Sequence, residues 1–278
     1  MISIKNYPDF LMCPLCRDNV HIDNDSFICK AGHRFPAGSG IIDFTTSGIE
    51  SKAPHADPDY RRWLEVSSDL LLESYRKGSV MKKIQDYGHT FLESRTVDNG
   101  WRLDLGCGSG RHFDFIDDKK RSVGFDFNFD NLKIASSANN TSLFIRGRME
   151  KLPFFDNSFH TIYAIYSLEH VLYLEDAIKE IKRVLVDGGQ LLAGLPAEGG
   201  ILYNSVRKFI TAPLINKKYG FDYEKVAKIE HCNGAKRVLD VLCAEFAKQS
   251  IEYFPFKISC IHANLIVLGV FRNEKKSE

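Results

Sequence analysis

The stretch LDLGCGSG at residues 103–110 decides the fold. Apolar residues end a short strand, and three glycines follow at alternate positions, Gly106, Gly108 and Gly110. Glycine adopts positive φ angles and lets the backbone approach a bound molecule closely. A helix beginning after the turn would direct its backbone N–H groups at that molecule. The stretch therefore predicts a strand, a ligand-binding turn and a helix.

An acidic residue at the end of the next expected strand indicates that the ligand is a nucleoside. Asp126 ends the next expected strand, 18 residues beyond Gly108. A carboxylate there can accept hydrogen bonds from both hydroxyls of a ribose. A dinucleotide-binding turn would carry glycine at position 111, where this chain has Arg111. An NAD-dependent oxidoreductase is therefore disfavoured.

Short apolar runs alternate with helical patterns on both sides of the turn. This alternation predicts an α/β fold with a parallel sheet covered by helices. The expected strands are residues 101–105, 122–126, 143–145, 160–166 and 190–196, with two more near 251–257 and 264–272. Residues 197–232 are rich in Tyr, Lys and Asn and break the rhythm, so we interpret them as an insertion that forms a lid over the substrate.

The composition excludes several classes of protein. The chain has 278 residues, 44% of them hydrophobic, and a net charge of +1, which is typical of neither a disordered nor a polybasic protein. No apolar run reaches the roughly 18 residues that a membrane span needs. The first residues do not resemble a secretory signal, and the seven cysteines are an odd number. We therefore expect free thiols or metal ligands in a cytoplasmic protein.

Three of the seven cysteines lie near the N-terminus. Cys13 and Cys16 form a C-x2-C pair, and Cys29 and His33 follow as C-x3-H. Three thiolates and one imidazole suit a closed, structural zinc site, and the metal would stabilise a segment too short to form its own core. We expect a zinc-ribbon-like module at residues 1–48, a linker and helical segment at 49–99, and the main domain at 100–274.

Further motifs carry a family resemblance. Residues 146–154 read RGRMEKLPF, residues 167–171 read SLEHV, and residues 183–189 read RVLVDGG. With the glycine turn and Asp126, they resemble the motifs of class I S-adenosylmethionine-dependent methyltransferases. The resemblance covers about residues 100–196. It implies a Rossmann-like sheet of seven strands, the last antiparallel, and an enzyme that transfers a methyl group from S-adenosylmethionine.

The resemblance also implies roles for individual residues. Asp104 would orient the cofactor's amino group, Asp126 would hold its ribose, and Met149 would lie beside its adenine. The family usually has Asp or Asn where this chain has Arg148, which leaves the contact to the adenine amino group open. The full set of expected cofactor-binding residues is Asp104, Gly106, Gly108, Gly110, Asp126, Met149, Glu150 and Tyr166.

The methyl acceptor is less well specified by the sequence. His170 follows the fourth strand, where a neutral imidazole could serve as a general base. The aromatic insertion and the formally neutral N-terminal module favour a small metabolite, a glycan or a lipid-linked intermediate. The cysteine spacing also resembles bacterial 23S ribosomal RNA guanine-N1 methyltransferases, so RNA remains an alternative acceptor. A cofactor-binding protein that acts as a scaffold is a second alternative. The sequence does not indicate the oligomeric state.

Overall fold

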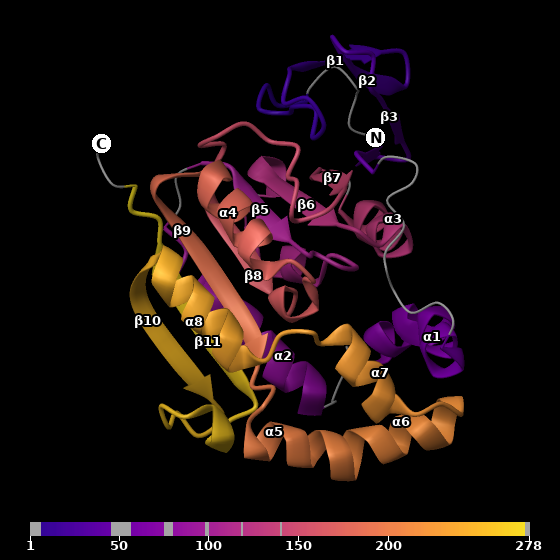
Figure 1. Ribbon diagram of the computed structural model, residues 1–278, viewed down its shortest axis with the longest axis vertical. Helices are drawn as coiled ribbons and strands as arrows, with labels where there is room; N and C mark the ends of the chain where they lie inside the picture. Colours follow the sequence, from indigo (N-terminus) through magenta and orange to yellow (C-terminus); the bar gives the residue numbers. More distant parts are fainter. Residues whose placement is uncertain are drawn as a thin grey trace.

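The structure is a computed structural model that describes residues 7–45, 57–74, 80–97, 100–117, 119–139 and 141–275. Within these residues, eleven strands form one sheet in the order β1-β2-β3-β4-β7-β6-β5-β8-β9-β11-β10 (Figure 1). The strands are β1 (Val20–Asp23), β2 (Ser26–Cys29), β3 (Arg34–Gly38), β4 (Ile41–Asp43), β5 (Arg102–Leu105), β6 (Ser122–Asp126), β7 (Leu143–Arg146), β8 (Phe159–Ile165), β9 (Leu185–Pro196), β10 (Ala247–Phe254) and β11 (Ile266–Arg272).

The helices connect these strands and cover the sheet. The α-helices are α1 (Pro58–Ser74), α2 (Val80–Glu93), α3 (Phe129–Ala138), α4 (Leu174–Val184), α5 (Ile201–Val206), α6 (Ala212–Tyr219), α7 (Tyr223–Glu230) and α8 (Ala235–Glu245). The shorter helical turns are η2 (Arg111–Asp114), η3 (Lys119–Arg121), η4 (Leu168–His170), η5 (Arg207–Thr211) and η6 (Ile261–Ala263). The expected linker falls largely on residues 46–56, which lie outside the described residues.

The sheet is mixed, which agrees with the expected α/β class. Strands β7, β6, β5, β8 and β9 are parallel, whereas β11 pairs antiparallel with both β9 and β10. The expected count of seven strands is wrong for the sheet as a whole. The N-terminal strands extend it because β4 pairs in parallel with β7. This pairing covers backbone groups that would otherwise lie on an open edge.

Both faces of the central strands are buried, as a parallel sheet requires. Along β8, Ile162 and Ala164 face the core under α4 and α8, whereas Tyr163 and Ile165 face the core under α2. Helix α3 covers the neighbouring part of the second face, near Phe144 on β7. The large apolar side chains of these strands are almost entirely inaccessible to solvent.

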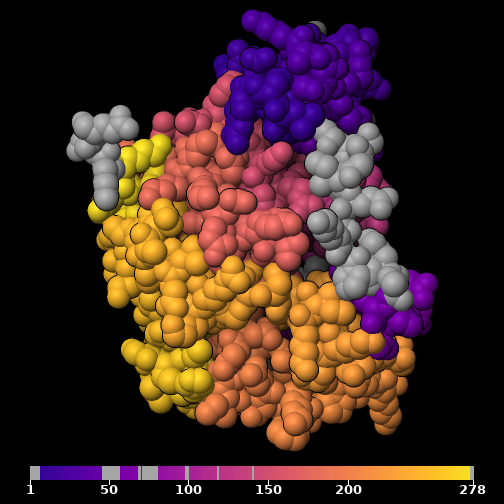
Figure 2. Space-filling model, viewed as in Figure 1, coloured from indigo at the N-terminus to yellow at the C-terminus, as the bar shows by residue number. Residues whose placement is uncertain are grey.

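The helices outside the sheet gather at one end of the molecule. Helices α1, α6 and α7 share a small separate core that includes Tyr60, Val66, Phe221 and Val226. Helices α5 to α7 lie within the expected insertion at residues 197–232. This end is opposite the N-terminal strands (Figures 1 and 2). Because β9 runs directly into α5, it is the end where the parallel strands finish.

Candidate active site

The glycine turn lies directly after β5 and has the backbone that its sequence indicates. Gly106, Gly108 and Gly110 have φ angles of 78°, 51° and 83°, a region that disfavours other residues. A Cβ added at Gly106 would lie 2.4 Å from the Ser167 Cβ and 2.9 Å from the Met149 Cε. The turn is thus in close contact with the segments that follow β7 and β8. The expected helix after the turn is only the short 3-10 turn η2, in which His112 and Phe113 are buried.

Asp126, at the end of β6, holds the turn in place. Its Oδ2 accepts a hydrogen bond from the Gly108 N–H at 2.8 Å, and its Oδ1 accepts one from the Asn128 N–H at 2.7 Å. Burial raises the pKa of this carboxyl, and these two hydrogen bonds act in the opposite direction. The structure therefore brings the expected ribose carboxylate and the glycine turn together.

Asp104 is a buried carboxyl beneath the turn. It is only 3% exposed, and its Oδ2 has no hydrogen-bond partner among the described residues. Burial, together with the nearby charge of Asp126, raises the pKa of Asp104 to about 8. A buried acceptor without a partner is costly. A cationic ligand group placed here would remove that cost.

The segment after β7 contains Arg148, Met149 and Glu150. The Arg148 guanidinium donates to the Glu150 Oε1 at 3.2 Å and lies 5.9 Å from the centre of the Phe127 ring. Arg148 is therefore held by its own loop, at the position where the methyltransferases that the motif resembles usually have Asp or Asn. Met149 contacts the glycine turn, and Glu150 is half-buried beside it.

Tyr166 follows β8 and has a φ of 55°, which is rare for a residue other than glycine. Its backbone N–H donates to the Gly194 carbonyl at 2.7 Å, which ties the end of β8 to β9. Its ring meets the His89 ring edge-on, with the two centres 6.1 Å apart. Tyr166 therefore points toward α2.

The two residues after Leu168 have opposite environments. The His170 side chain is 39% exposed, and its Nδ1 lies 2.9 Å from the Glu230 carbonyl oxygen. Glu169 is only 3% exposed, and its Oε2 has no hydrogen-bond partner among the described residues. Burial raises the pKa of Glu169 to about 7. His170 was the predicted candidate base, and the sequence did not indicate that its neighbour Glu169 is the buried one of the two.

Charged residues near Glu169 fasten the insertion to the end of β9. Glu198 pairs with both His231 and Arg207, and the Arg207 Nε lies 3.1 Å from the Glu224 Oε1. Burial raises the pKa of Tyr203, and the charges of Glu198 and Glu169 add to that effect. Glu169 therefore lies in a neighbourhood of ion pairs and tyrosines contributed by the insertion.

A second buried polar cluster lies behind the turn and was not foreseen. His89 on α2 and His112 on η2 are both buried, with their Nδ1 atoms 3.1 Å apart. Burial lowers the pKa of His89 to about 3 and lowers that of His112 as well. Burial favours the neutral form of both rings, and a hydrogen bond between them needs the Nδ1–H of one ring to donate to the Nδ1 of the other. This pair packs α2 against the turn.

The N-terminal cysteines and histidine come together as the spacing predicts. One ligand atom each from Cys13, Cys16, Cys29 and His33 lies within 4.8 Å of all the others. The Cys16 and Cys29 Sγ atoms are 3.5 Å apart, and the Cys29 Sγ lies 3.2 Å from the His33 Nδ1. These separations fit four atoms arranged around one ion.

The cysteine cluster is joined directly to the main domain. The Met12 N–H donates to the Pro153 carbonyl at 2.9 Å, and the Phe155 N–H donates to the Phe10 carbonyl at the same distance. Arg17 also forms an ion pair with Glu180 on α4 at 3.0 Å. The segment that leads to Cys13 therefore contacts the loop that follows Met149 and Glu150.

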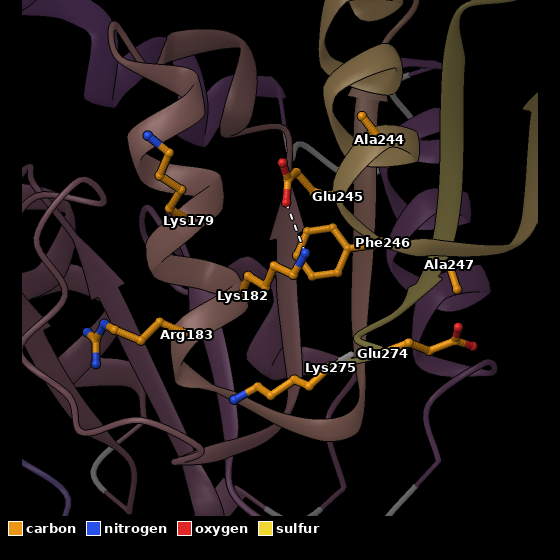
Figure 3. Close-up of a pocket in the computed structure, with 9 residues that line it drawn as sticks. All are labelled: Lys179, Lys182, Arg183, Ala244, Glu245, Phe246, Ala247, Glu274 and Lys275. Atoms are coloured by element: carbon orange, nitrogen blue, oxygen red, sulfur yellow. Dashed lines mark hydrogen bonds and ion pairs between the residues drawn. The ribbon is translucent and has the colours of Figure 1, made fainter. Parts of the chain in front are cut away.

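A groove between the ends of α4 and α8 lies away from this site (Figure 3). Its lining includes Lys179, Lys182 and Arg183 from α4, and Lys182 pairs with Glu245 at 2.9 Å. The groove is at the starting ends of the strands, because α4 leads into β9 there. Ligands of open α/β sheets bind at the finishing ends, where the glycine turn lies.

The chain is similar to known methyltransferases. A family model described as a methyltransferase domain matches residues 103–193. Malonyl-[acyl-carrier protein] O-methyltransferase of Buchnera aphidicola is 28% identical over 199 residues, 69% of this chain and 77% of the relative. Ubiquinone/menaquinone biosynthesis C-methyltransferase UbiE of a Shewanella species is 31% identical over 134 residues, 42% of this chain and 53% of the relative. The chain spans about half the length of other curated relatives, 47% and 51% in two cases.

Solved structures support the fold. The [4+2]-cyclase SpnF has a TM-score of 0.52 and 18% identity, and the match covers 70% of this chain and 82% of that one. At this identity the likeness shows the fold alone. The sequence matches show that residues 103–193 are similar to a methyltransferase domain. No helix in the described part of the chain is long and apolar enough to cross a membrane.

Proposed function

We propose that this protein transfers a methyl group from S-adenosylmethionine to a small or lipid-linked acceptor. The observation that carries the proposal is the buried carboxyl of Asp104 beneath a turn of three glycines. Its Oδ2 lacks a partner among the described residues, and its pKa is raised to about 8. Such a site suits the ammonium group of the cofactor's methionine part.

The surrounding residues fit the rest of the cofactor. Asp126 would accept hydrogen bonds from the ribose hydroxyls, as carboxylates at the end of a second strand do. Gly106, Gly108 and Gly110 would allow close approach of the methionine part. Met149 and Glu150 would line the adenine side, and Tyr166, whose ring points toward α2, would lie beside the methionine part or the adenine. The bound cofactor supplies an electrophilic methyl group on a sulfonium.

Glu169 is the better proposal for the group that takes a proton from the acceptor. A carboxyl with a pKa near the working pH can accept a proton during the reaction. Glu169 has this property and a carboxylate oxygen without a partner among the described residues, whereas the His170 Nδ1 lies 2.9 Å from a backbone carbonyl oxygen. His170 would instead orient the insertion through Glu230. Helices α5 to α7 would form the wall or lid of the acceptor pocket.

The relatives and the charges of the N-terminal region favour a small or lipid-linked acceptor over RNA. One relative is named for malonyl-[acyl-carrier protein], and another is named for the biosynthesis of ubiquinone and menaquinone. Recognition of RNA needs a basic surface that meets phosphates. In the N-terminal region Arg17 and Arg34 are paired with Glu180 and Asp23, which reduces their contribution to such a surface.

We further propose that Cys13, Cys16, Cys29 and His33 hold one structural zinc ion. Three soft thiolates and one imidazole are the ligands that zinc prefers, and four protein ligands leave no open position for catalysis. The ion would stabilise the N-terminal strands, whose fourth strand extends the sheet beside β7.

The function is tested by adding the purified protein and labelled S-adenosylmethionine to an extract of cells that lack the protein, and then measuring where the labelled methyl group appears. The extract is separated into lipid, small-molecule and RNA fractions. Label in the lipid or small-molecule fraction, lost with the Asp126→Ala variant, supports the proposal. Stoichiometric label in one ribosomal RNA guanine would replace it with the RNA alternative. Absence of label in every fraction, despite tight cofactor binding, would favour a scaffold.

A further inference from the structure

Apolar side chains are exposed at the end of the molecule where the parallel strands finish. Within the described residues, eight large apolar side chains are more than half exposed, and six of them lie in two neighbouring segments. Four are on the helical segment 201–219, and two are on the loop between β10 and β11. The six are Ile201 (69%), Phe209 (71%), Ile210 (56%), Leu214 (65%), Phe256 (62%) and Ile258 (55%).

The helical segment has two different faces. Its inner face packs against the protein through Arg207, which binds Glu198 and Glu224, and through Ile215, which joins the core of α1 and α7. Phe209 and Leu214 lie on the other side, without neighbours that bury them. A helix with an unburied apolar face has a second surface to contact.

The charged residues of the helical segment itself are all basic. Residues 201–221 contain Arg207, Lys208, Lys217 and Lys218 and no acidic residue. The three lysines are all exposed and flank the apolar side chains along the helix. Basic residues beside exposed Phe, Ile and Leu are typical of helices that lie flat in the surface of an anionic membrane.

The loop between β10 and β11 lies beside the start of this helix. Figure 1 shows the two together at the lower end of the molecule, and Figure 2 shows helices α5 to α7 along that end. A Cβ added at Gly200 would lie 2.2 Å from the Ile261 carbonyl oxygen, so the two segments are in close contact. Phe256 and Ile258 therefore extend the same apolar surface, with Lys257 between them.

We infer that this surface, formed by Ile201, Phe209, Ile210, Leu214, Phe256 and Ile258 with the flanking lysines, docks on an anionic lipid bilayer. The apolar side chains would enter the boundary between headgroups and acyl chains, and the lysines would meet lipid phosphates. A second copy of the chain fits less well. A symmetric contact would place Lys208, Lys217 and Lys218 opposite the same lysines with no acidic residue in the helix to neutralise them.

This surface has a consequence for the acceptor. It lies at the end of the sheet that carries the glycine turn and Glu169, so docking would present that end to the membrane. An acceptor carried by a lipid could then enter the pocket without leaving the bilayer. This consequence rests on the proposed methyl transfer, whereas docking itself does not.

The experiment is co-sedimentation of the full-length protein with lipid vesicles. The wild-type protein should bind vesicles of phosphatidylcholine mixed with phosphatidylglycerol, bind pure phosphatidylcholine far more weakly, and dissociate in high salt. Combining Phe209→Ser, Ile210→Ser and Leu214→Ser should weaken binding at least about tenfold, because the buried apolar area is lost. Val97→Ser is the matched control, since Val97 is 58% exposed and precedes β5 at the other end of the sheet.

A second set of variants tests the charge. Combining Lys208→Gln, Lys217→Gln and Lys218→Gln should also weaken binding to anionic vesicles at least about tenfold, since each basic residue contributes near the surface. Binding of S-adenosylmethionine should be unchanged in every variant, which shows that the protein is folded. The inference would be overturned if the wild-type protein did not bind anionic vesicles. It would also be overturned if the serine and glutamine variants bound them as well as Val97→Ser does. A wild-type protein that forms a dimer, loses it on the serine substitutions and binds no vesicles would also overturn the inference. Loss of cofactor binding in the wild type would instead count against the proposed function.

Discussion

Replacing Asp104 by Asn should stabilise the protein without ligand, most strongly at high pH. The pKa of Asp104 is raised from an ordinary value of 3.8 to about 8, because the carboxyl is buried near Asp126. Between these two pH values the Asp104 carboxyl is therefore protonated in the folded state and ionised in the unfolded state. The stability associated with that proton is complete below pH 4 and is lost as the pH rises through 8. Asparagine has the same shape and does not titrate, so its stability lacks this dependence.

The size of the effect follows from the pKa. Each pH unit in this window changes the unfolding free energy by about 1.4 kcal/mol. From about pH 5 to about pH 8 the difference between Asp104→Asn and wild type should therefore grow in favour of the variant by about 4 kcal/mol. Urea unfolding of both proteins at several pH values measures this difference directly. If the difference in unfolding free energy between the two proteins stays constant across this pH range, the assignment of a buried, protonated Asp104 is refuted.

The same substitution should weaken cofactor binding. A charge-assisted hydrogen bond to the cofactor's ammonium contributes about 1.5–3 kcal/mol, so affinity should fall roughly 10- to 100-fold. Binding to the wild type should release protons at pH 7, because burial raises the pKa of Asp104 to about 8 and most of these carboxyls are protonated beforehand. Calorimetry in buffers of different ionisation enthalpy measures this release. An equal release by Asp104→Asn would show that the proton comes from another group.

Two further predictions concern the metal and the acceptor side. Protein purified without added metal should contain one zinc ion per chain, and Cys13→Ser combined with Cys16→Ser should abolish it in elemental analysis; a ratio near zero in the wild type would refute the zinc site. Glu169→Gln should lower the rate of methyl transfer by about 10²- to 10⁴-fold with little change in cofactor affinity. In the wild type the rate should rise with pH through about 7, because the carboxylate must be free of its proton to accept another. A Glu169→Gln rate close to that of wild type, or a larger loss in His170→Gln, would return the role to His170.

The parts of the fold that depend on short stretches of sequence could be predicted from the sequence. The strand before the glycine turn was expected at residues 101–105 and is Arg102–Leu105, and the strand ending at Asp126 has the expected bounds. The three cysteines and the histidine that were predicted to bind a metal lie close together, as their spacing indicates. In each case short-range rules decide the outcome, because turn glycines and closely spaced ligands fix the local geometry.

The parts of the fold that depend on tertiary contacts could not be predicted from the sequence. Nothing in residues 41–43 alone indicates that β4 pairs with β7, about 100 residues away, and extends the sheet beyond seven strands. Glu169 and His170 are adjacent in sequence, and only packing decides that the first is buried and the second exposed. The partnership of His89 and His112 likewise depends on how α2 packs behind the turn.

Titration of the protein with S-adenosylmethionine in a calorimeter tests the central claim most directly. The wild type should bind one cofactor per chain, and Asp126→Ala should bind at least about tenfold more weakly, because hydrogen bonds to the ribose are lost. Asp130→Ala is a suitable control, since Asp130 lies in the first turn of α3 nearby and pairs only with Lys133 among the described contacts. Equal binding by wild type and Asp126→Ala, or no binding by the wild type, would contradict the account.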